Sequence, residues 1–151
     1  MAIAQAMCTT FKKELMTATH NFATNGNTFR LALYAEGSGG KSNTTATLGA
    51  ATTAYTTTGE VANSGSYAAG GGELTKVAPS NAGTTGITDF ADISFTTASI
   101  TAMGALIYND TSSGNSAVCV LDFTSNKTST SGTFTVQFPT ADASNAIIRI
   151  A

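Results

Sequence analysis

Charged side chains are scarce in this chain. They make up 11% of its 151 residues, whereas an ordinary globular domain has about 25%. The sequence has one histidine, His20, two cysteines, Cys8 and Cys119, and no tryptophan. Because most enzymatic reactions use ionisable side chains as acids, bases or nucleophiles, this composition argues against an enzyme, and we expect no cofactor.

The chain also lacks any cluster of one charge. Its formal net charge is -2, and the only adjacent cations are Lys12 and Lys13. Sequence-independent binding of nucleic acid needs clustered Lys and Arg, so we expect no nucleic-acid partner. No run of about 18 apolar residues occurs, which argues against a transmembrane helix, and the N-terminus lacks the basic and apolar regions of a secretion signal. We therefore expect no membrane partner, and synthesis and assembly in the cytoplasm.

The first twenty residues predict a helix. Ile3, Met7, Phe11 and Leu15 recur at every fourth position and would form one apolar stripe. That stripe has two possible roles: it packs on the protein's own core, or it docks on a partner subunit. These four residues are our candidate interface.

The rest of the chain predicts β-structure. Short apolar or alternating segments are separated by turns rich in Gly, Asn and Ser. We expect strands at 28–34, around Val61, at 74–77 (closed by Pro79), 87–95, 99–103, 105–108, 117–123, 133–138 and 146–150, with turns at 109–115 and 125–132. About eight strands without crossover helices favour an antiparallel, jelly-roll-like β-sandwich. We expect a single domain over 1–151, with a helix over 1–20 and the sandwich over 28–151.

Few residues suggest a ligand site. Gly40-Lys41-Ser42 matches the end of a phosphate-binding loop, but Ala35 stands where the first glycine is required and no helix is predicted to follow. Asp89 and Asp92 would face opposite sides of a strand, unless a bulge brings them together to bind Ca²⁺. His20 is predicted to cap or pack the helix, and the two cysteines lie in apolar stretches typical of buried free thiols.

Several segments carry a resemblance that covers nearly the whole chain. Among them are 67–71, 89–92, 104–109 and, most specifically, Phe138-Pro139-Thr140-Ala141-Asp142. The pattern resembles a family of small virion proteins of tailed phages that infect aquatic bacteria, cyanophages among them. This resemblance implies a non-enzymatic structural component of the particle.

Within the particle, we expect a capsid decoration (cement) protein on the capsid exterior. It would bind the major capsid protein and form a homotrimer. Two alternatives stay open: a tail or fibre component, and a carbohydrate-binding β-sandwich. Carbohydrate-binding modules usually present Trp or Tyr platforms, and the four tyrosines do not cluster in the sequence.

Overall fold

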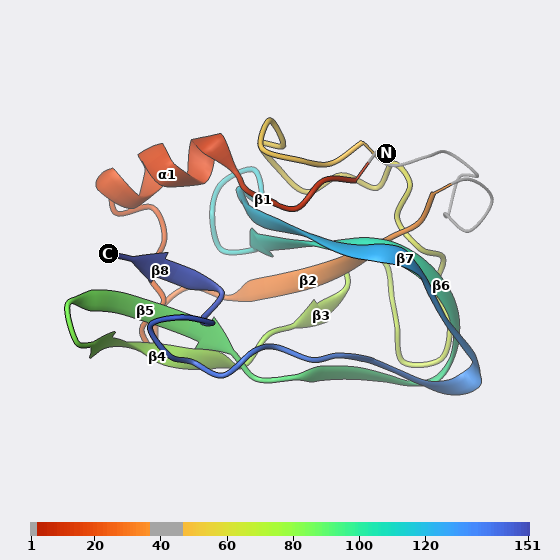
Figure 1. Ribbon diagram of the computed structural model, residues 1–151. Coiled ribbons are helices and arrows are strands. Elements are labelled where there is room, and N and C mark those ends of the chain that lie inside the picture. The colour runs from red at the N-terminus through yellow and green to blue at the C-terminus, as the bar shows by residue number, and fades with distance from the viewer. Residues whose placement is uncertain (1–2, 37–46) are drawn as a thin grey trace.

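Two antiparallel sheets and one short helix form the fold (Figure 1), which confirms the predicted β-sandwich. The computed structural model describes residues 3–36 and 47–151. The five-stranded sheet has the order β1-β7-β6-β2-β3, and the three-stranded sheet has the order β4-β5-β8. The elements are β1 (Ala6–Met7), α1 (Thr9–Met16), β2 (Phe29–Tyr34), β3 (Gly72–Glu73), β4 (Lys76–Ala82), β5 (Thr85–Phe90), β6 (Ile93–Asn109), β7 (Ala117–Val136) and β8 (Ile148–Ile150).

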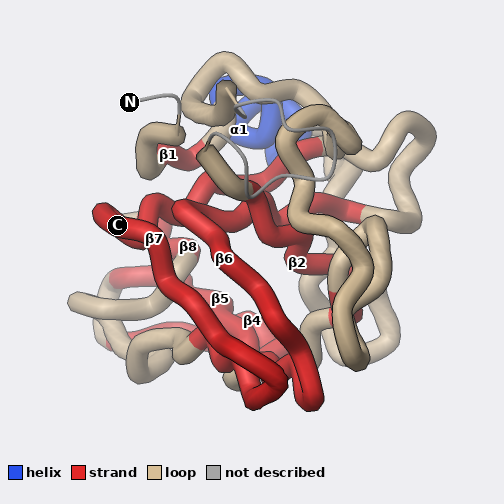
Figure 2. The backbone as a smooth tube through the Cα atoms, turned by 90° about the vertical axis from the view of Figure 1, so that its right-hand side faces the viewer, coloured by secondary structure: helices blue, strands red, loops and turns tan. Residues whose placement is uncertain are grey.

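The long hairpin of β6 and β7 is the largest feature of the fold. Figure 2 shows the two strands side by side, and their register runs from Ile93 opposite Val136 to Tyr108 opposite Ala117. Four register shifts interrupt the pairing. Such bulges bend a strand and increase its twist, which allows this hairpin to curve around one end of the sandwich (Figure 1).

The predicted turn at 125–132 was wrong, because this segment lies inside β7. Its short hydroxyl side chains bond across to β6: Thr101 and Thr128 Oγ1 lie 3.2 Å apart, and Ser129 Oγ donates to the Ala98 carbonyl at 2.8 Å. The local tendency to turn persists as a positive φ of 45° at Ser131. Cross-strand pairing therefore overrides a composition that is typical of loops.

Other predicted strands also differ: 99–103 and 105–108 lie within one continuous strand, β6, and no named strand contains Val61. Pro79 does not end a strand, because β4 continues through it and a register shift between Val77 and Ser80 accommodates the missing N–H. The segment 87–95 is two strands, β5 and β6, which belong to different sheets and are separated at Ala91 and Asp92. The polar dipeptide is thus a connection between the sheets.

The N-terminal helix is shorter than the prediction of residues 1–20. Residues before it are extended: Ile3 pairs with Leu48, and Met7 pairs with Cys119 of β7. The helix α1 covers eight residues and is followed by Ala18, whose φ of 55° is not helical. Apolar residues four positions apart thus occur both in the extended segment and in the helix, so this spacing does not indicate where the helix begins.

The buried apolar side chains of the described residues form a contiguous core between the sheets and beneath α1. At one end, phenylalanines pack against each other, with Phe22 and Phe29 stacked at 4.3 Å between ring centroids. Phe11 of α1 meets Phe22 edge-on at 6.1 Å. These rings fix α1 against the end of the sandwich where β5 and β8 also lie (Figure 1).

Candidate functional site

The four candidate interface residues separate into two pairs. Ile3 and Phe11 have no exposed surface and belong to the core, so for them the structure selects core packing. Met7 and Leu15 are only partly buried and pack against that core. A contact with a partner subunit stays a prediction for this second pair.

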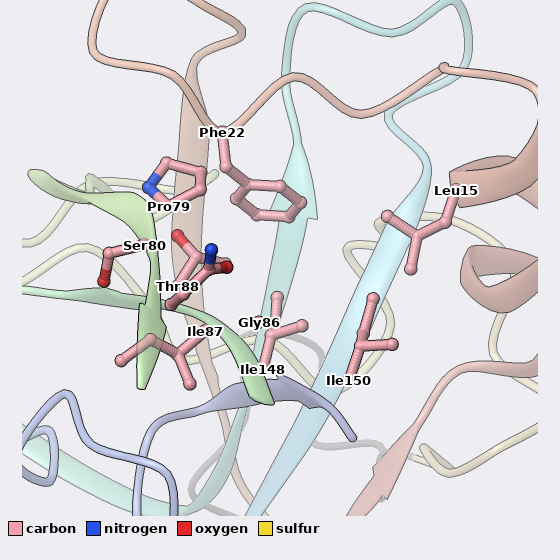
Figure 3. Close-up of a pocket in the computed structure, with 10 residues that line it drawn as sticks. Leu15, Phe22, Pro79, Ser80, Gly86, Ile87, Thr88, Ile148 and Ile150 are labelled. Atoms are coloured by element: carbon pink, nitrogen blue, oxygen red, sulfur yellow. The ribbon is translucent and has the colours of Figure 1, made fainter. Parts of the chain in front are cut away.

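Leu15 lines a groove between α1 and the three-stranded sheet, with a volume of about 370 Å³. Figure 3 shows Leu15 on the α1 side of this groove, Phe22 above it, and Ile148 and Ile150 on β8. Pro79 and Ile87 complete its apolar lining. We call this feature the α1–β8 groove.

Exposed apolar side chains flank the α1–β8 groove. Met16, next to Leu15 at the end of α1, is 82% exposed, and Ile150 in the groove itself is 61% exposed. Val77 on β4 is exposed to 38%. Large apolar side chains in contact with water are typical of surfaces that bind another macromolecule when they lie together.

The edge of the small sheet adds a second feature to the same end of the molecule. β8 is the terminal strand in the order β4-β5-β8 and pairs with β5 along one side. A terminal strand offers unpaired backbone N–H and C=O groups on its other side, to which an extended segment can bind. The α1–β8 groove therefore lies over the small sheet and reaches its terminal strand β8, an arrangement that can bind an extended segment of protein.

His20 lies inside the protein, as the prediction of a packing role requires. Its ring lies 4.8 Å from the Phe11 ring, and its Nε2 is 2.8 Å from Glu14 Oε2. Its Nδ1 is 3.1 Å from Asn109 Nδ2, and Ser116 Oγ donates to Glu14 Oε1 at 3.3 Å. Nothing in the sequence pairs these residues, because Asn109 and Ser116 are about ninety or more positions away from His20 and Glu14.

A second buried polar cluster has Glu60 at its centre, and the sequence analysis missed it. Glu60 has no exposed surface. Its carboxylate accepts hydrogen bonds from the hydroxyls of Tyr55 (2.7 Å) and Tyr67 (3.0 Å) and from the backbone N–H of Gly70 (2.6 Å). Tyr108 stacks on Tyr55 with ring centroids 4.7 Å apart.

The tyrosines around Glu60 have raised pKa values. Burial is the first cause for Tyr34, Tyr55 and Tyr67, and the nearby Glu60 carboxylate adds to it. These hydroxyls therefore stay protonated and act as hydrogen-bond donors. The tyrosines do gather in space: Tyr34, Tyr67 and Tyr108 are buried, and Tyr55 is partly exposed beside Tyr108.

Both cysteines are free and buried, as predicted. Burial raises the pKa of Cys8 to about 11 and that of Cys119 to about 12. A reactive cysteine needs a lowered pKa and access to solvent. Neither thiol meets these conditions.

Asp89 and Asp92 serve different backbone groups. Asp89 accepts hydrogen bonds from the N–H groups of Phe90 (2.8 Å) and Ile147 (3.2 Å), and Asp92 accepts one from Phe138 (2.7 Å). Burial raises the pKa of the Asp89 carboxyl, and its two N–H donors partly offset that rise. In the described part of the chain, no three His, Cys, Asp or Glu side chains are grouped so that they could hold a metal ion.

The partial phosphate-loop pattern at 40–42 lies outside the described residues. Within the described residues, no helix is long and apolar enough to cross a membrane.

A comparison with protein-family models found no match, and neither did comparisons with curated proteins and with solved structures.

Proposed function

We propose that this protein is a non-enzymatic structural component of a tailed-phage particle, where it decorates the outside of the capsid. The observation that carries the proposal is the α1–β8 groove, with Met16 and Ile150 exposed beside it. A cement protein acts by contact, so it needs a stable fold and an adhesive surface. The resemblance of the sequence to small virion proteins supplies the setting for that contact.

The partner in this proposal is the major capsid protein of the same particle. Leu15, Met16 and Ile150 would lose their contact with water when the groove is covered, and burial of apolar surface stabilises by about 25 cal/mol per Å². The free edge of β8 would accept an extended segment of the shell. Apolar burial and strand pairing together define the contact.

The location of the titratable groups is consistent with a contact role. His20, Glu60, Cys8 and Cys119 are buried, and the hydrogen bonds of His20 and Glu60 are made to other side chains or to the backbone. Each of these groups stabilises the fold where it lies. Threonine and serine cover much of the exposed β6–β7 hairpin, and such short side chains lose little conformational entropy on docking.

A homotrimer is part of the proposal. One groove of this size offers limited area, but three copies held together would bind a shell far more tightly than one through effective concentration. Decoration proteins that bridge several capsomers would gain from such multivalency. The trimer is tested by the molar mass of the purified protein in solution.

The experiment that tests the proposal is the copy number of this chain per particle, measured by quantitative mass spectrometry against the major capsid protein. A ratio near one to one or one to two supports capsid decoration. A few to a few dozen copies per particle would instead indicate the tail or a fibre. Absence from purified particles would reject a virion role.

A second candidate function is carbohydrate binding, and one surface feature favours it. A hollow of about 360 Å³ lies beside β7, with polar side chains and two aromatic rings in its wall: Gln5, Asp122, Gln137, Arg149, Phe123 and Phe138. A small number of polar groups over an apolar surface can orient a sugar. Glycan-array binding by the wild type that is lost in Asp122→Ala would support this function, and an empty array would reject it.

A further inference from the structure

His20 and Asn109 connect the segment after α1 to the turn that follows β6. The His20 side chain has no exposed surface, and both of its ring nitrogens have a partner. Nε2 lies 2.8 Å from Glu14 Oε2 on α1, and Nδ1 lies 3.1 Å from Asn109 Nδ2 at the end of β6. The imidazole therefore spans two elements that are far apart in the sequence.

The surroundings of Asn109 decide which of its amide atoms faces the imidazole. Its Oδ1 accepts hydrogen bonds from the backbone N–H groups of Thr111 (3.0 Å) and Ser112 (3.2 Å), which can only donate. Its Nδ2 carries two hydrogens and lies near three acceptors, the Thr19 carbonyl (3.3 Å), Asn27 Oδ1 (3.2 Å) and His20 Nδ1 (3.1 Å), so these acceptors share the two hydrogens. An amide is assigned by such partners, and here they fix the NH₂ group toward the ring.

The two partners of the imidazole favour one tautomer of the neutral ring. The Glu14 carboxylate can only accept, so it takes the proton on Nε2. Nδ1 faces the NH₂ group of Asn109, which can only donate, so a lone pair on Nδ1 suits this partner.

We propose that neutral His20 is a proton-sensitive latch that holds α1 against the turn after β6, and that a proton from solvent opens it by binding Nδ1. Protonated Nδ1 and Asn109 Nδ2 would be two donors facing each other 3.1 Å apart. Asn109 cannot turn its oxygen toward the ring without losing its bonds to Thr111 and Ser112. The proton therefore breaks the contact that joins the two elements.

Glu14 acts in the opposite direction, because its carboxylate attracts an imidazolium. Its side chain is 20% exposed, so solvent screens this attraction only in part. Asn109 has no exposed surface, so a donor left unsatisfied there cannot bond to water instead. The other titratable groups on the elements around the ring are Cys8, Lys12, Lys13, Arg30, Lys76, Asp89, Tyr108 and Asp110.

Opening the latch would free one wall of the α1–β8 groove. Leu15, which lines the groove, and Met16 are the last residues of α1, and His20 follows after a short connection. Acid would thus loosen the segment that carries these side chains. The latch itself does not depend on the proposed capsid role, because it concerns contacts within one chain.

The first test measures the tautomer in the full-length protein by ¹⁵N–¹H correlation of the imidazole. His20 is the only histidine, so its signals need no assignment by mutation. At about pH 7.5 we expect a proton on Nε2 and none on Nδ1, because Nε2 faces the Glu14 carboxylate and Nδ1 faces the NH₂ group of Asn109. A proton on Nδ1 at this pH, in either the other tautomer or the charged form, would overturn the proposal.

The second test measures hydrogen exchange of the α1 amides between about pH 7.5 and about pH 5.5, the range in which histidine titrates. After correction for intrinsic rates, we expect opening to increase about tenfold on acidification, as for the loss of one buried hydrogen bond. Unchanged protection across this range, with His20 protonated in the same spectra, would contradict the latch.

Two variants provide matched controls. In Asn109→Asp the carboxylate can accept from Nδ1–H, so acid should strengthen the contact and α1 exchange should slow. In Glu14→Gln the acceptor remains but its charge is lost, so acid should loosen α1 more than in the wild type. If Asn109→Asp does not fold, the wild-type tautomer and the Glu14→Gln comparison still decide the outcome, and an equal acid response in Glu14→Gln and wild type would argue against it.

Discussion

The hydroxyl of Tyr67 donates a hydrogen bond to Oε1 of Glu60 across 3.0 Å, and neither side chain has contact with solvent beyond 1%. The same oxygen accepts from the backbone N–H of Gly70, and Tyr108 donates to the carbonyl of Gly70 at 2.7 Å. Glu60 thus joins the loop after β2 to the turn before β3. A carboxylate in this position is a structural crosslink made of hydrogen bonds.

Replacement of Glu60 should therefore destabilise the protein in proportion to the number of partners that lose their hydrogen bond. Glu60→Ala leaves two hydroxyls and a backbone N–H without an acceptor, and we expect a loss of at least about 3 kcal/mol. Glu60→Gln keeps one acceptor oxygen and should lose about 1–2 kcal/mol. Urea unfolding followed by circular dichroism measures both, and a Glu60→Ala variant as stable as Glu60→Gln would contradict the crosslink.

Phe11 and Met16 lie on the same short helix but should respond differently to a charge. Phe11 is fully buried against His20 and Phe22, so Phe11→Asp should unfold the chain, and Phe11→Ala should lose about 3–5 kcal/mol. Met16 is 82% exposed, so Met16→Asp should change the free energy of unfolding by less than about 0.5 kcal/mol.

The same pair of variants also tests the proposed contact. Met16→Asp should remain folded and lose binding to capsids that lack the native protein, measured by co-sedimentation. A folded, soluble Phe11→Asp that fails to bind would instead place Phe11 at an interface. Retained binding by both Met16→Asp and Ile150→Asp, the second at a residue that lines the groove, would exclude the α1–β8 groove as the contact.

The strands with regular alternation could be predicted from the sequence. Phe29, Leu31 and Leu33 alternate with other residues and form β2, and the polar residues after Asn109 form the turn between β6 and β7. The buried state of both cysteines also followed from their apolar neighbours. In each case the signal is local, because side chains close in sequence define both the element and its buried face.

The features that escaped prediction depend on contacts between distant segments. The Thr- and Ser-rich part of β7 is a strand because β6 pairs with it, and Met7 is extended because its partner is Cys119. Glu60 is buried because hydroxyls from other segments reach its carboxylate. These partners lie in other segments of the chain, so the composition and periodicity around one position do not predict them.

Two glycines with positive φ provide a matched test of close packing. A Cβ at Gly71 (φ 73°) would lie 1.8 Å from the carbonyl oxygen of Leu31, whereas a Cβ at Gly83 (φ 64°) would have no atom within 4 Å. Gly83→Ala should lose only the conformational term of about 1–2 kcal/mol. Gly71→Ala must in addition displace β2, so its thermal midpoint should fall well below that of Gly83→Ala, and equal midpoints would show that the turn moves freely.

Alkaline pH should destabilise the protein through its two thiols. Burial raises the pKa of Cys8 to about 11 and that of Cys119 to about 12, while both would ionise near pH 8.5 in the unfolded chain. A group whose pKa is higher in the folded state contributes stability that is complete below the unfolded pKa and declines as the pH rises. Between about pH 8.5 and 9.5 the free energy of unfolding should fall by about 1 kcal/mol per thiol.

The chosen window limits the contribution of the tyrosines, because in the unfolded chain about three quarters of them remain protonated at about pH 9.5, and what they contribute is common to the wild type and the control. Urea midpoints across this window measure the decline, and Cys119→Ala provides the control. That variant loses some core packing at every pH, but its stability should fall only about half as steeply, since Cys8 alone remains to ionise. An equal slope in the wild type and in Cys119→Ala would show that the thiol of Cys119 does not limit alkaline stability.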